Sequence, residues 1–559
     1  MILFRNTSIK IFFILFVLTV INIFQGRYTE LLADEAYYWT YSNFLDWGYF
    51  DHPPMVAIWI TISKFFFNDT ELSVRFFSAI SYSVSVFLVW KTIANPKKEH
   101  YLNFFFLVIF ASVLFSVYGF ITVPDTPLMF FFALFLLGYK RYVQNKNTIS
   151  YLLIIISVVG LLYSKYQAVL IVFFVLLSNF KLLKDYKLWI SLGVILLLFL
   201  PHLYWQYLHD FVTFKYHLVD RSAKAGYNFS DTLLHFGNCM VIVGPTFPLV
   251  YLAAYKNLKT PDVFNKGLNY IIIGFISFFF LMTFKGHVQA QWIVPIAIPL
   301  VIISFNYFIE NPKYYKLLTR LSIVTICLVA VARILIIVDV LPVQLDFHGN
   351  KKWVATIKNK LDDKTPLFID SYQKTSLFWF YSGVQPHQYN SLWGRNNQYN
   401  LYEFNKSFTI KNSLVVGVLK QSANDSIIEK NTKKMYLNEV SNLSIANNIE
   451  VTYPEIVVIS EGLNTFPITL KNIDENFVPF SQDIHVYFFD NKLKFLLQVK
   501  ATIVSNKENV DKKDSLFLLE FTLPNNINNS KISNFKLGVF PDLNLQIKGV
   551  GGYKKCVLN

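Results

Sequence analysis

The sequence predicts a polytopic α-helical membrane protein with a soluble C-terminal tail. Hydrophobic residues make up 54% of the 559 residues, and the mean hydropathy is +0.39, whereas soluble domains contain about 45–50% apolar residues. From Ile9 to about Leu341 the chain alternates apolar runs of roughly 16–22 residues with short polar joints. Beyond Asp346 no run is long enough to cross a bilayer. The tail of roughly two hundred residues is long enough for its own core.

The apolar runs predict eleven membrane spans within residues 1–345. Their centres lie near residues 17, 83, 110, 133, 156, 173, 196, 244, 275, 299 and 328. The first run could instead be a cleaved signal peptide, because it has a basic start and a modest hydrophobic length. The ten later spans would hold the chain in the membrane in either case.

Basic residues in the joints predict how the spans are oriented. Alternate joints hold seventeen Lys and Arg residues, whereas the joints on the opposite side hold eight. Because Lys and Arg are enriched on the cytoplasmic side, the odd number of spans places the tail outside. The net charge of +15 is therefore mainly a topology signal, and it indicates no nucleic-acid partner. Frequent Lys, Asn, Ile and Phe residues suggest an AT-rich bacterial genome, and hence a bacterial cytoplasmic membrane.

The first outward loop carries the most informative stretch, ADEAYYWTYSNFLDWGYFDHPP, which begins at Ala33. It contains two adjacent acids, Asp34 and Glu35, and a further acid beside a histidine, Asp51 and His52. Its aromatic residues and its proline pair predict two short interfacial helices, one after Asp34 and one over 58–67. Carboxylates at the edge of a bilayer are costly without partners or a function. This loop is therefore a candidate site.

Other outward loops hold further candidate residues. Asp125 lies between two prolines at the start of the fourth span, where a helix cap and an active-site role are both open. Lys165 falls between two apolar runs and either snorkels to the interface or faces a cavity. Later segments add His217, Arg221, Lys285, His287, Gln291 and Trp292.

These motifs resemble, in their order, the GT-C glycosyltransferases that use polyprenyl-phosphate sugars. The relevant features are DEAYYW, YFDHPP, PDTPL, the lysine at the fifth joint and the Lys…Gln-Trp start of a late span. The resemblance is to the protein O-mannosyltransferases and lipid A aminoarabinose transferases of glycosyltransferase family 39. It covers about residues 1–345 and implies a GT-C fold. One departure is that Asp51-His52 stands where the aminoarabinose transferases have Glu-Lys.

The resemblance implies an enzyme that moves a sugar from a polyprenyl-phosphate donor to a protein, lipid A or another glycolipid on the outer face. Asp34 matches the proposed catalytic base, Asp125 matches a second acid, and Lys165 and Arg221 are expected near the lipid phosphate. The chemistry agrees, because the leaving phosphate needs fixed cations and the acceptor hydroxyl needs a base. Direct displacement would invert the anomeric carbon. Glu35 is a further catalytic candidate, and the expected substrate contacts are Asp51, His52, His217, Lys285, Gln291 and Trp292.

A divalent metal is an open question at this stage. Asp51, His52 and His217 are suitable ligand types, but histidines in an aromatic loop also serve as simple hydrogen-bond partners. We therefore assign no cofactor, and a divalent metal stays open.

Two functions of other classes remain open. A polytopic transporter or flippase would also carry many spans and intramembrane charges. A non-enzymatic subunit of polysaccharide assembly would not need Asp34. The position of the charges in outward loops favours the enzyme.

The tail is predicted to contain an α/β domain over residues 346–454 and a β-sandwich over 455–559. In the first part, a strand at 367–370, a helix ending at Gly383 and a strand at 413–419 follow one another. In the second part, short alternating strands recur from Glu455 onward. The tail shows no catalytic motif, so we expect acceptor docking or shielding of the site.

Overall fold

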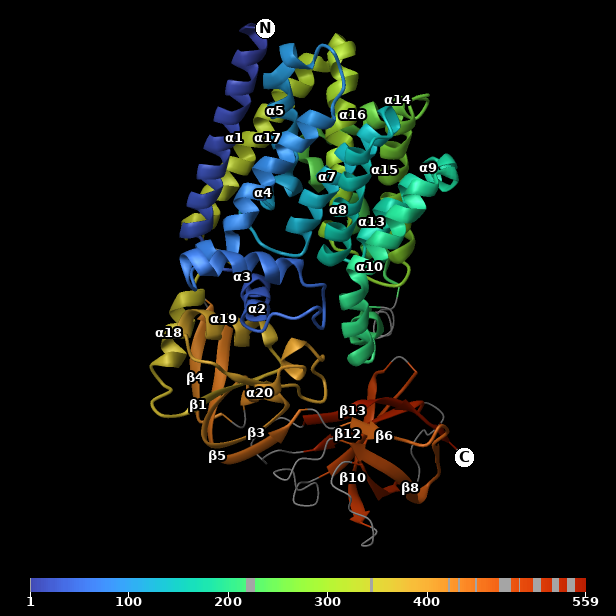
Figure 1. Ribbon diagram of the computed structural model, residues 1–559. Helices are drawn as coiled ribbons and strands as arrows, with labels where there is room; N and C mark the ends of the chain where they lie inside the picture. Colours follow the sequence, from blue (N-terminus) through green and yellow to red (C-terminus); the bar gives the residue numbers. More distant parts are fainter. Residues whose placement is uncertain are drawn as a thin grey trace. The chain divides into compact units, whose positions relative to one another are not determined.

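The computed structural model describes residues 2–217, 227–341, 345–420, 423–430, 433–447, 450–471, 484–491, 493–505, 514–524, 532–539 and 548–558. The chain divides into two compact units, Met1–His348 and Gly349–Asn559. The first unit is helical and the second is rich in strands (Figure 1).

The helical unit combines long helices with short ones. The long helices are α1 (Ile2–Tyr28), α4 (Glu71–Thr92), α7 (Asp125–Gln144), α8 (Thr148–Ser164), α10 (Tyr186–Leu208), α13 (Phe229–Val243), α15 (Val263–Met282), α16 (Ala297–Glu310) and α17 (Pro312–Ile337). The shorter ones are α2 (Ala33–Asn43), α3 (Met55–Phe67), α5 (Leu102–Phe110), α6 (Val113–Val117), α9 (Ala168–Ser178), α11 (Val212–Lys215) and α14 (Phe247–Asn257). The 3-10 helices are η1 (Lys98–Tyr101), η2 (Phe180–Lys184), η4 (Gly244–Thr246) and η5 (Ala290–Ile296).

All eleven predicted span centres lie in helical segments. Within the described residues, seven segments are long and apolar enough to cross a membrane by themselves. They are Thr7–Tyr28, Glu71–Thr92, Tyr186–Leu208, Phe229–Asn257, Val263–Met282, Ala290–Glu310 and Pro312–Ile337. The other four predicted spans differ for physical reasons. The third is split into α5 and α6, α7 carries Asp125, Lys140 and Arg141, and α8 and α9 have 17 and 11 residues.

The surface and the interior of the bundle suit a lipid environment. Helix α1 leaves Phe12, Phe13 and Phe16 between 63% and 67% exposed, which fits a lipid-facing surface. Helix α4 packs against α1 and α7, and it buries small residues such as Ser78 and Ser85. Small residues let helix backbones approach closely where lipid supplies no hydrophobic drive.

The two short helices predicted in the first loop are present. Helix α2 begins at Ala33, one residue before Asp34, and α3 begins directly after Pro54. Thr70 then caps α4, since its hydroxyl accepts the N–H of Ser73 at 3.3 Å.

The second unit begins with a five-stranded sheet in the order β2-β1-β3-β5-β4. Its strands are β1 (Thr365–Ile369), β2 (His387–Tyr389), β3 (Ser407–Val416), β4 (Asp425–Lys430) and β5 (Lys433–Ala446), with helices α18 (Asn350–Lys358), α19 (Tyr372–Ser382), η6 (Gln398–Asn400) and α20 (Glu403–Lys406). Strand β1 runs parallel to β2 and to β3. Gly383, at φ 71°, ends α19. These features confirm the predicted strand, helix and strand.

A seven-stranded antiparallel sheet follows, in the order β13-β12-β9-β10-β11-β8-β6. Its strands are β6 (Glu450–Thr452), β8 (Gly462–Lys471), β9 (Ile484–Phe489), β10 (Phe495–Ser505), β11 (Asp514–Leu523), β12 (Asn534–Val539) and β13 (Lys548–Lys555). A parallel ladder of β7 (Val458–Ile459) and β14 (Val557–Leu558) adds Ile459 and Val457 to its core. From residue 450 onward, the strands in the described ranges form this seven-stranded sheet and the small ladder.

Candidate functional site

Asp34 and Glu35 occupy the first turn of α2 but have different surroundings. Asp34 is partly exposed, whereas Glu35 is fully buried. The Glu35 carboxylate accepts the backbone N–H of Leu32 at 3.0 Å. A helix N-terminus favours negative charge, so both acids lie in a favourable position.

Glu35 forms a buried ion pair with Arg75 of α4. The Arg75 Nε donates to Glu35 Oε1 at 2.7 Å, and a second guanidinium nitrogen contacts Oε2. The other N–H groups of Arg75 donate to the backbone carbonyls of Gly26, Thr29 and Glu30 at 3.2, 2.6 and 2.9 Å. Arg75 therefore joins the end of α1 to the start of α2.

The same carboxylate anchors the loop that leads into α7. The backbone N–H of Thr122 donates to Glu35 Oε1 at 2.9 Å, and the Thr122 hydroxyl contacts that of Ser78. The Thr126 hydroxyl donates to the carbonyl of Ile121 at 2.9 Å. This loop leads directly to Asp125, the first residue of α7, so the position of Asp125 depends in part on Glu35.

Asp125 and Lys165 form the second ion pair of the site. Lys165 Nζ lies 2.8 and 2.9 Å from the two Asp125 carboxylate oxygens. The side chains are 5% exposed for Asp125 and 12% exposed for Lys165. Lys165 follows the end of α8, and Asp125 is the first residue of α7. Lys165 is thus largely buried in an ion pair, and a role as a cation that faces a cavity stays a prediction.

An aromatic and amide network surrounds the segment after Lys165. The Tyr166 hydroxyl lies 2.8 Å from His202 Nε2 and accepts from Gln206 Nε2 at 2.9 Å. The other His202 ring nitrogen lies 2.6 Å from the carbonyl of Trp47. Gln206 also donates to the Thr213 hydroxyl at 2.7 Å. This network ties α10 to the first loop and fixes Tyr166 beside Lys165.

Asp51 and two histidines gather against α2. Asp51 is 5% exposed and accepts hydrogen bonds from the hydroxyls of Tyr37 at 2.8 Å and Tyr41 at 3.4 Å. His217 Nε2 lies 2.9 Å from the Asp51 carbonyl, and the rings of His52 and His217 are 6.1 Å apart. In the parts of the chain that the structure describes, no three His, Cys, Asp or Glu side chains are grouped to hold a metal ion.

The predicted late-span residues lie on η5 and the segment before it. His287 faces Asp231 of α13 at 3.2 Å, Gln291 donates to Gln289 at 2.9 Å, and Trp292 packs against Phe279. Lys285 is exposed. The predicted phosphate contact Arg221 lies outside the described residues.

Sequence reasoning did not identify Arg75, Tyr166, His202 or Gln206 as site residues. An arginine within an apolar span is a recognised functional signal, and Arg75 near the start of α4 gives that signal. The other three are ordinary members of aromatic segments, so sequence alone offers no cue for them.

Comparison with known proteins adds independent evidence. The family model described as dolichyl-phosphate-mannose-protein mannosyltransferase matches residues 51–205. The lipid A galacturonosyltransferase RgtD of Rhizobium johnstonii is 26% identical over 309 residues, which are 52% of this chain and 63% of RgtD. The chain thus spans less than two thirds of that relative.

Solved structures settle the architecture. ArnT from Cupriavidus metallidurans in the apo state aligns with a TM-score of 0.54 at 14% identity, over 78% of this chain and 98% of ArnT. The chain has the GT-C fold. ArnT bound to undecaprenyl phosphate aligns with a TM-score of 0.50 at 13% identity, over 76% of this chain and 97% of that structure. The predicted fold class, a GT-C membrane part with a β-rich tail, is confirmed.

Proposed function

We propose that this GT-C protein is an integral membrane glycosyltransferase that moves a sugar from a polyprenyl phosphate to an acceptor hydroxyl. The matching family model is that of a mannosyltransferase, and RgtD is a galacturonosyltransferase. ArnT has been solved with undecaprenyl phosphate, which supports a donor of this kind. RgtD acts on lipid A, which favours a glycolipid acceptor over a protein.

The observation that carries the proposal is the pairing of Lys165 with Asp125. The carboxylate holds the amine at one point where the ends of two helices meet. A cation fixed in advance is what a leaving phosphate needs, because negative charge grows on its oxygens as the sugar departs. The second pKa of such a phosphate is about 6 by analogy with phosphorylated side chains, so no strong acid is required.

Asp34 is the proposed base, and Glu35 is the residue that positions it. The acceptor oxygen would attack the anomeric carbon while the bond from that carbon to the phosphate oxygen breaks. The phosphate leaves with the electron pair, and the hydroxyl proton passes to the Asp34 carboxylate. Glu35 already accepts hydrogen bonds from Arg75, Leu32 and Thr122. One direct displacement inverts the anomeric carbon.

The remaining residues have proposed supporting roles. Asp51, His52 and His217 contact or flank α2 and are placed to contact the transferred sugar. Arg221, Lys285, Gln291 and Trp292 stay candidates for the donor. We propose that the site and the tail face the outside of a bacterial cytoplasmic membrane, as the charge of the joints indicates.

The test is a transfer assay with purified full-length protein, beside a measurement of polyprenyl-phosphate binding. Asp34→Asn should lower turnover by about 10²-fold or more, the range for general-base catalysis, and should leave donor binding intact. Asp69→Asn is the matched control, since Asp69 lies in the same loop, pairs with Lys64 at 3.0 Å and is half exposed. Unchanged turnover in Asp34→Asn would remove Asp34 from the mechanism. A wild type that moves the lipid across vesicles without transfer would favour a flippase.

A further inference from the structure

The strand order of the five-stranded sheet reverses at β1. Strand β1 lies between β2 and β3 and is parallel to both. The chain leaves β1, passes through α19 to β2 on one side, and later reaches β3 on the other side. In open α/β sheets, ligands bind beyond the carboxyl ends of the strands where the order reverses in this way. Asp370 is the first residue after β1.

Asp370 is held in an uncommon conformation there. Its φ is 60°, a region that residues other than glycine seldom adopt. Its N–H donates to the carbonyl of Tyr389 at 3.0 Å, and its carboxylate accepts the backbone N–H and the hydroxyl of Ser391. A Cβ at Gly394 would lie 2.1 Å from Asp370 Oδ1, so the close approach requires glycine. Strain of this kind is found at functional sites.

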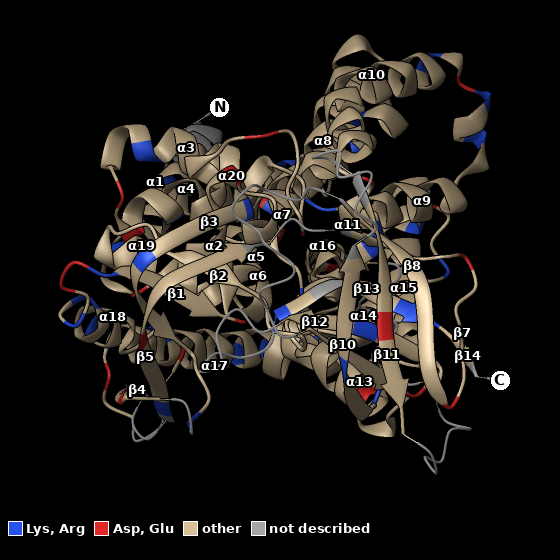
Figure 2. Ribbon diagram, turned by 90° about the horizontal axis from the view of Figure 1, so that it is seen from below, with Lys and Arg blue, Asp and Glu red and all other residues tan. Residues whose placement is uncertain are grey.

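Two lysines from the seven-stranded sheet lie at the same place. Ser391 forms an antiparallel bridge with Lys548, the first residue of β13. Lys536 of β12 donates to the carbonyl of Leu392 at 3.2 Å, and its amine lies 5.2 Å from the centre of the Tyr553 ring. Figure 2 colours the lysine and arginine residues of the chain blue and its acidic residues red. The two sheets therefore bring one carboxylate and two amines together.

Lys548 is a buried lysine at the first position of β13. It is 8% exposed. Burial, together with the nearby charge of Lys536, lowers the pKa of Lys548 from 10.5 to about 7. Burial of a charged amine beside another amine is costly, whereas a methionine side chain would fill a similar space without that charge. Asp370 can balance only one of the two amines.

An aromatic surface adjoins this charged cluster. Trp393 is 50% exposed, although its ring packs against Phe489 and Phe495, each at 5.7 Å, and against Tyr487 at 6.5 Å. Phe495 is itself 41% exposed. Trp393 is therefore packed against neighbouring rings and still half exposed. A sugar ring can stack on such an indole, because aromatic side chains offer large rigid contact area.

We propose that the tail binds an anionic saccharide at this place, with its acidic group between Lys536 and Lys548 and a sugar ring on Trp393. The acidic group is a carboxylate or a phosphate, since either is a suitable partner for paired amines. This inference goes beyond the transfer reaction and does not depend on it.

Calorimetric titration of the full-length protein in detergent tests the proposal. The probes are glucuronate, glucose 6-phosphate, glucose and inorganic phosphate. We expect one or both acidic sugars to bind at least ten-fold more tightly than glucose. Lys548→Met and Lys536→Gln should each weaken that binding at least ten-fold. Trp393→Ala should weaken binding of the acidic sugars but not of inorganic phosphate. The relative affinities of glucuronate and glucose 6-phosphate identify the acidic group.

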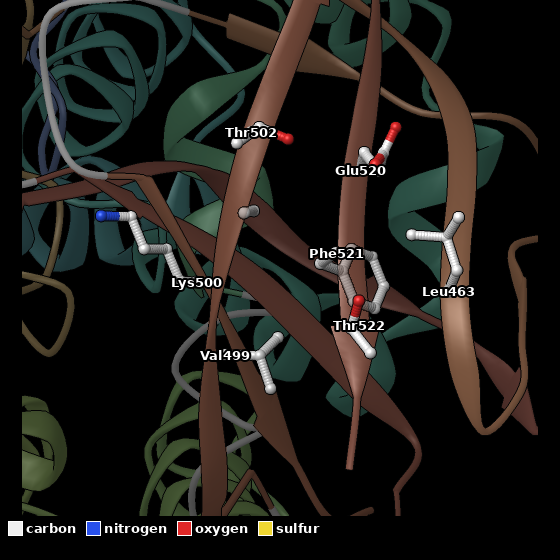
Figure 3. Close-up of a pocket in the computed structure, with 8 residues that line it drawn as sticks. Leu463, Val499, Lys500, Thr502, Glu520, Phe521 and Thr522 are labelled. Carbon is white, nitrogen blue, oxygen red and sulfur yellow. The ribbon is translucent and has the colours of Figure 1, made fainter.

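Lys500→Met is the matched control. Lys500 is an exposed lysine on β10, and it lines an open depression of about 440 Å³ with Thr502, Glu520 and Leu463 (Figure 3). Its loss should leave binding unchanged. The proposal is overturned if neither acidic sugar binds more tightly than glucose, or if Lys500→Met weakens binding as much as Lys548→Met. Because the readout is binding to the tail, it stands whether or not transfer is observed.

Discussion

Glu35 and Arg75 lie forty residues apart in the chain and form an ion pair whose side chains are 0% and 1% exposed. The pair joins the end of α1, the start of α2 and the loop before α7. Asp34 directly precedes Glu35, and Asp125 directly follows that loop. One buried pair therefore fixes both acids of the proposed active site relative to the membrane helices.

The first prediction concerns the stability of this pair. Arg75→Met should destabilise the protein by about 3–5 kcal/mol, because it leaves the Glu35 carboxylate buried without its counter-charge. Thermal unfolding of the purified variant measures this loss. Glu310→Gln is the control, since Glu310 and its partner Lys97 are 50% and 58% exposed and exposed pairs contribute only about 0–1 kcal/mol. Equal stability of Arg75→Met and wild type would show that the pair does not hold the site together.

The second prediction concerns the lipid phosphate. Lys165→Met should weaken polyprenyl-phosphate binding about ten-fold or more, because a charge-assisted contact contributes roughly 1.5–3 kcal/mol. Arg221→Gln should do the same if Arg221 also holds the phosphate. Direct binding of polyprenyl phosphate to the purified variants is the measurement.

The variant Asp125→Asn tests whether Asp125 is only a structural residue or has a role in the active site. If Asp125 only positions the amine, the variant should bind the donor with a moderate loss and keep its fold. Arg27→Gln removes a half-exposed cation at the end of α1 and serves as the control. Donor affinity that is unchanged in both Lys165→Met and Arg221→Gln would leave the phosphate site without its proposed residues.

Local patterns predicted the helices and strands well. All eleven span centres predicted from apolar runs fall in helical segments, and Gly383 marked the end of α19. The lengths of the helices were less predictable, because the positions at which a helix breaks depend on tertiary contacts. Gly244 separates α13 from α14 at φ 56°, and a Cβ there would lie 2.8 Å from Val113 Cγ2. No sequence pattern shows that Val113 packs at this point.

The partners of the site residues were beyond sequence reasoning. Asp125 and Lys165 are forty residues apart, and sequence alone left a cap and a snorkelling lysine open. The residue types were informative because charges in outward loops are costly. Which acid pairs with which cation depends on how α4, α7 and α8 pack, and periodicity does not encode that packing.

The third prediction is the topology. A reporter fused after Asp346 should be active only outside the cytoplasmic membrane, because seventeen basic residues lie in the alternate joints and eight in the others. A fusion in the joint at residues 94–98, which holds Lys97 and Lys98, should report the cytoplasm. A cytoplasmic tail would overturn both the orientation and the assignment of an outward-facing site.

The fourth prediction concerns Lys548 and pH. The ordinary pKa of its amine is 10.5, and burial lowers it to about 7 in the folded tail. Between these values the unfolded chain binds more protons than the folded chain, so the stability of the tail should rise with pH. Below pH 7 both states are protonated, and the folded state bears the full cost of the buried charge. Lys548→Met should therefore be more stable than wild type at pH 6.

The stability advantage of Lys548→Met over wild type should shrink by a few kcal/mol between pH 6 and pH 9, since one pKa unit corresponds to about 1.4 kcal/mol. Urea unfolding of the tail, followed by limited proteolysis of the full-length protein at both pH values, gives the comparison. Lys500→Met, which removes an exposed lysine, should follow the wild-type pH dependence. If Lys548→Met were less stable than wild type at pH 6, the Lys548 amine would stabilise the fold, and this would contradict a role reserved for an anionic ligand. If Lys548→Met is more stable than wild type, then Lys548 destabilises the folded tail. That is expected of a residue whose role is to bind a ligand.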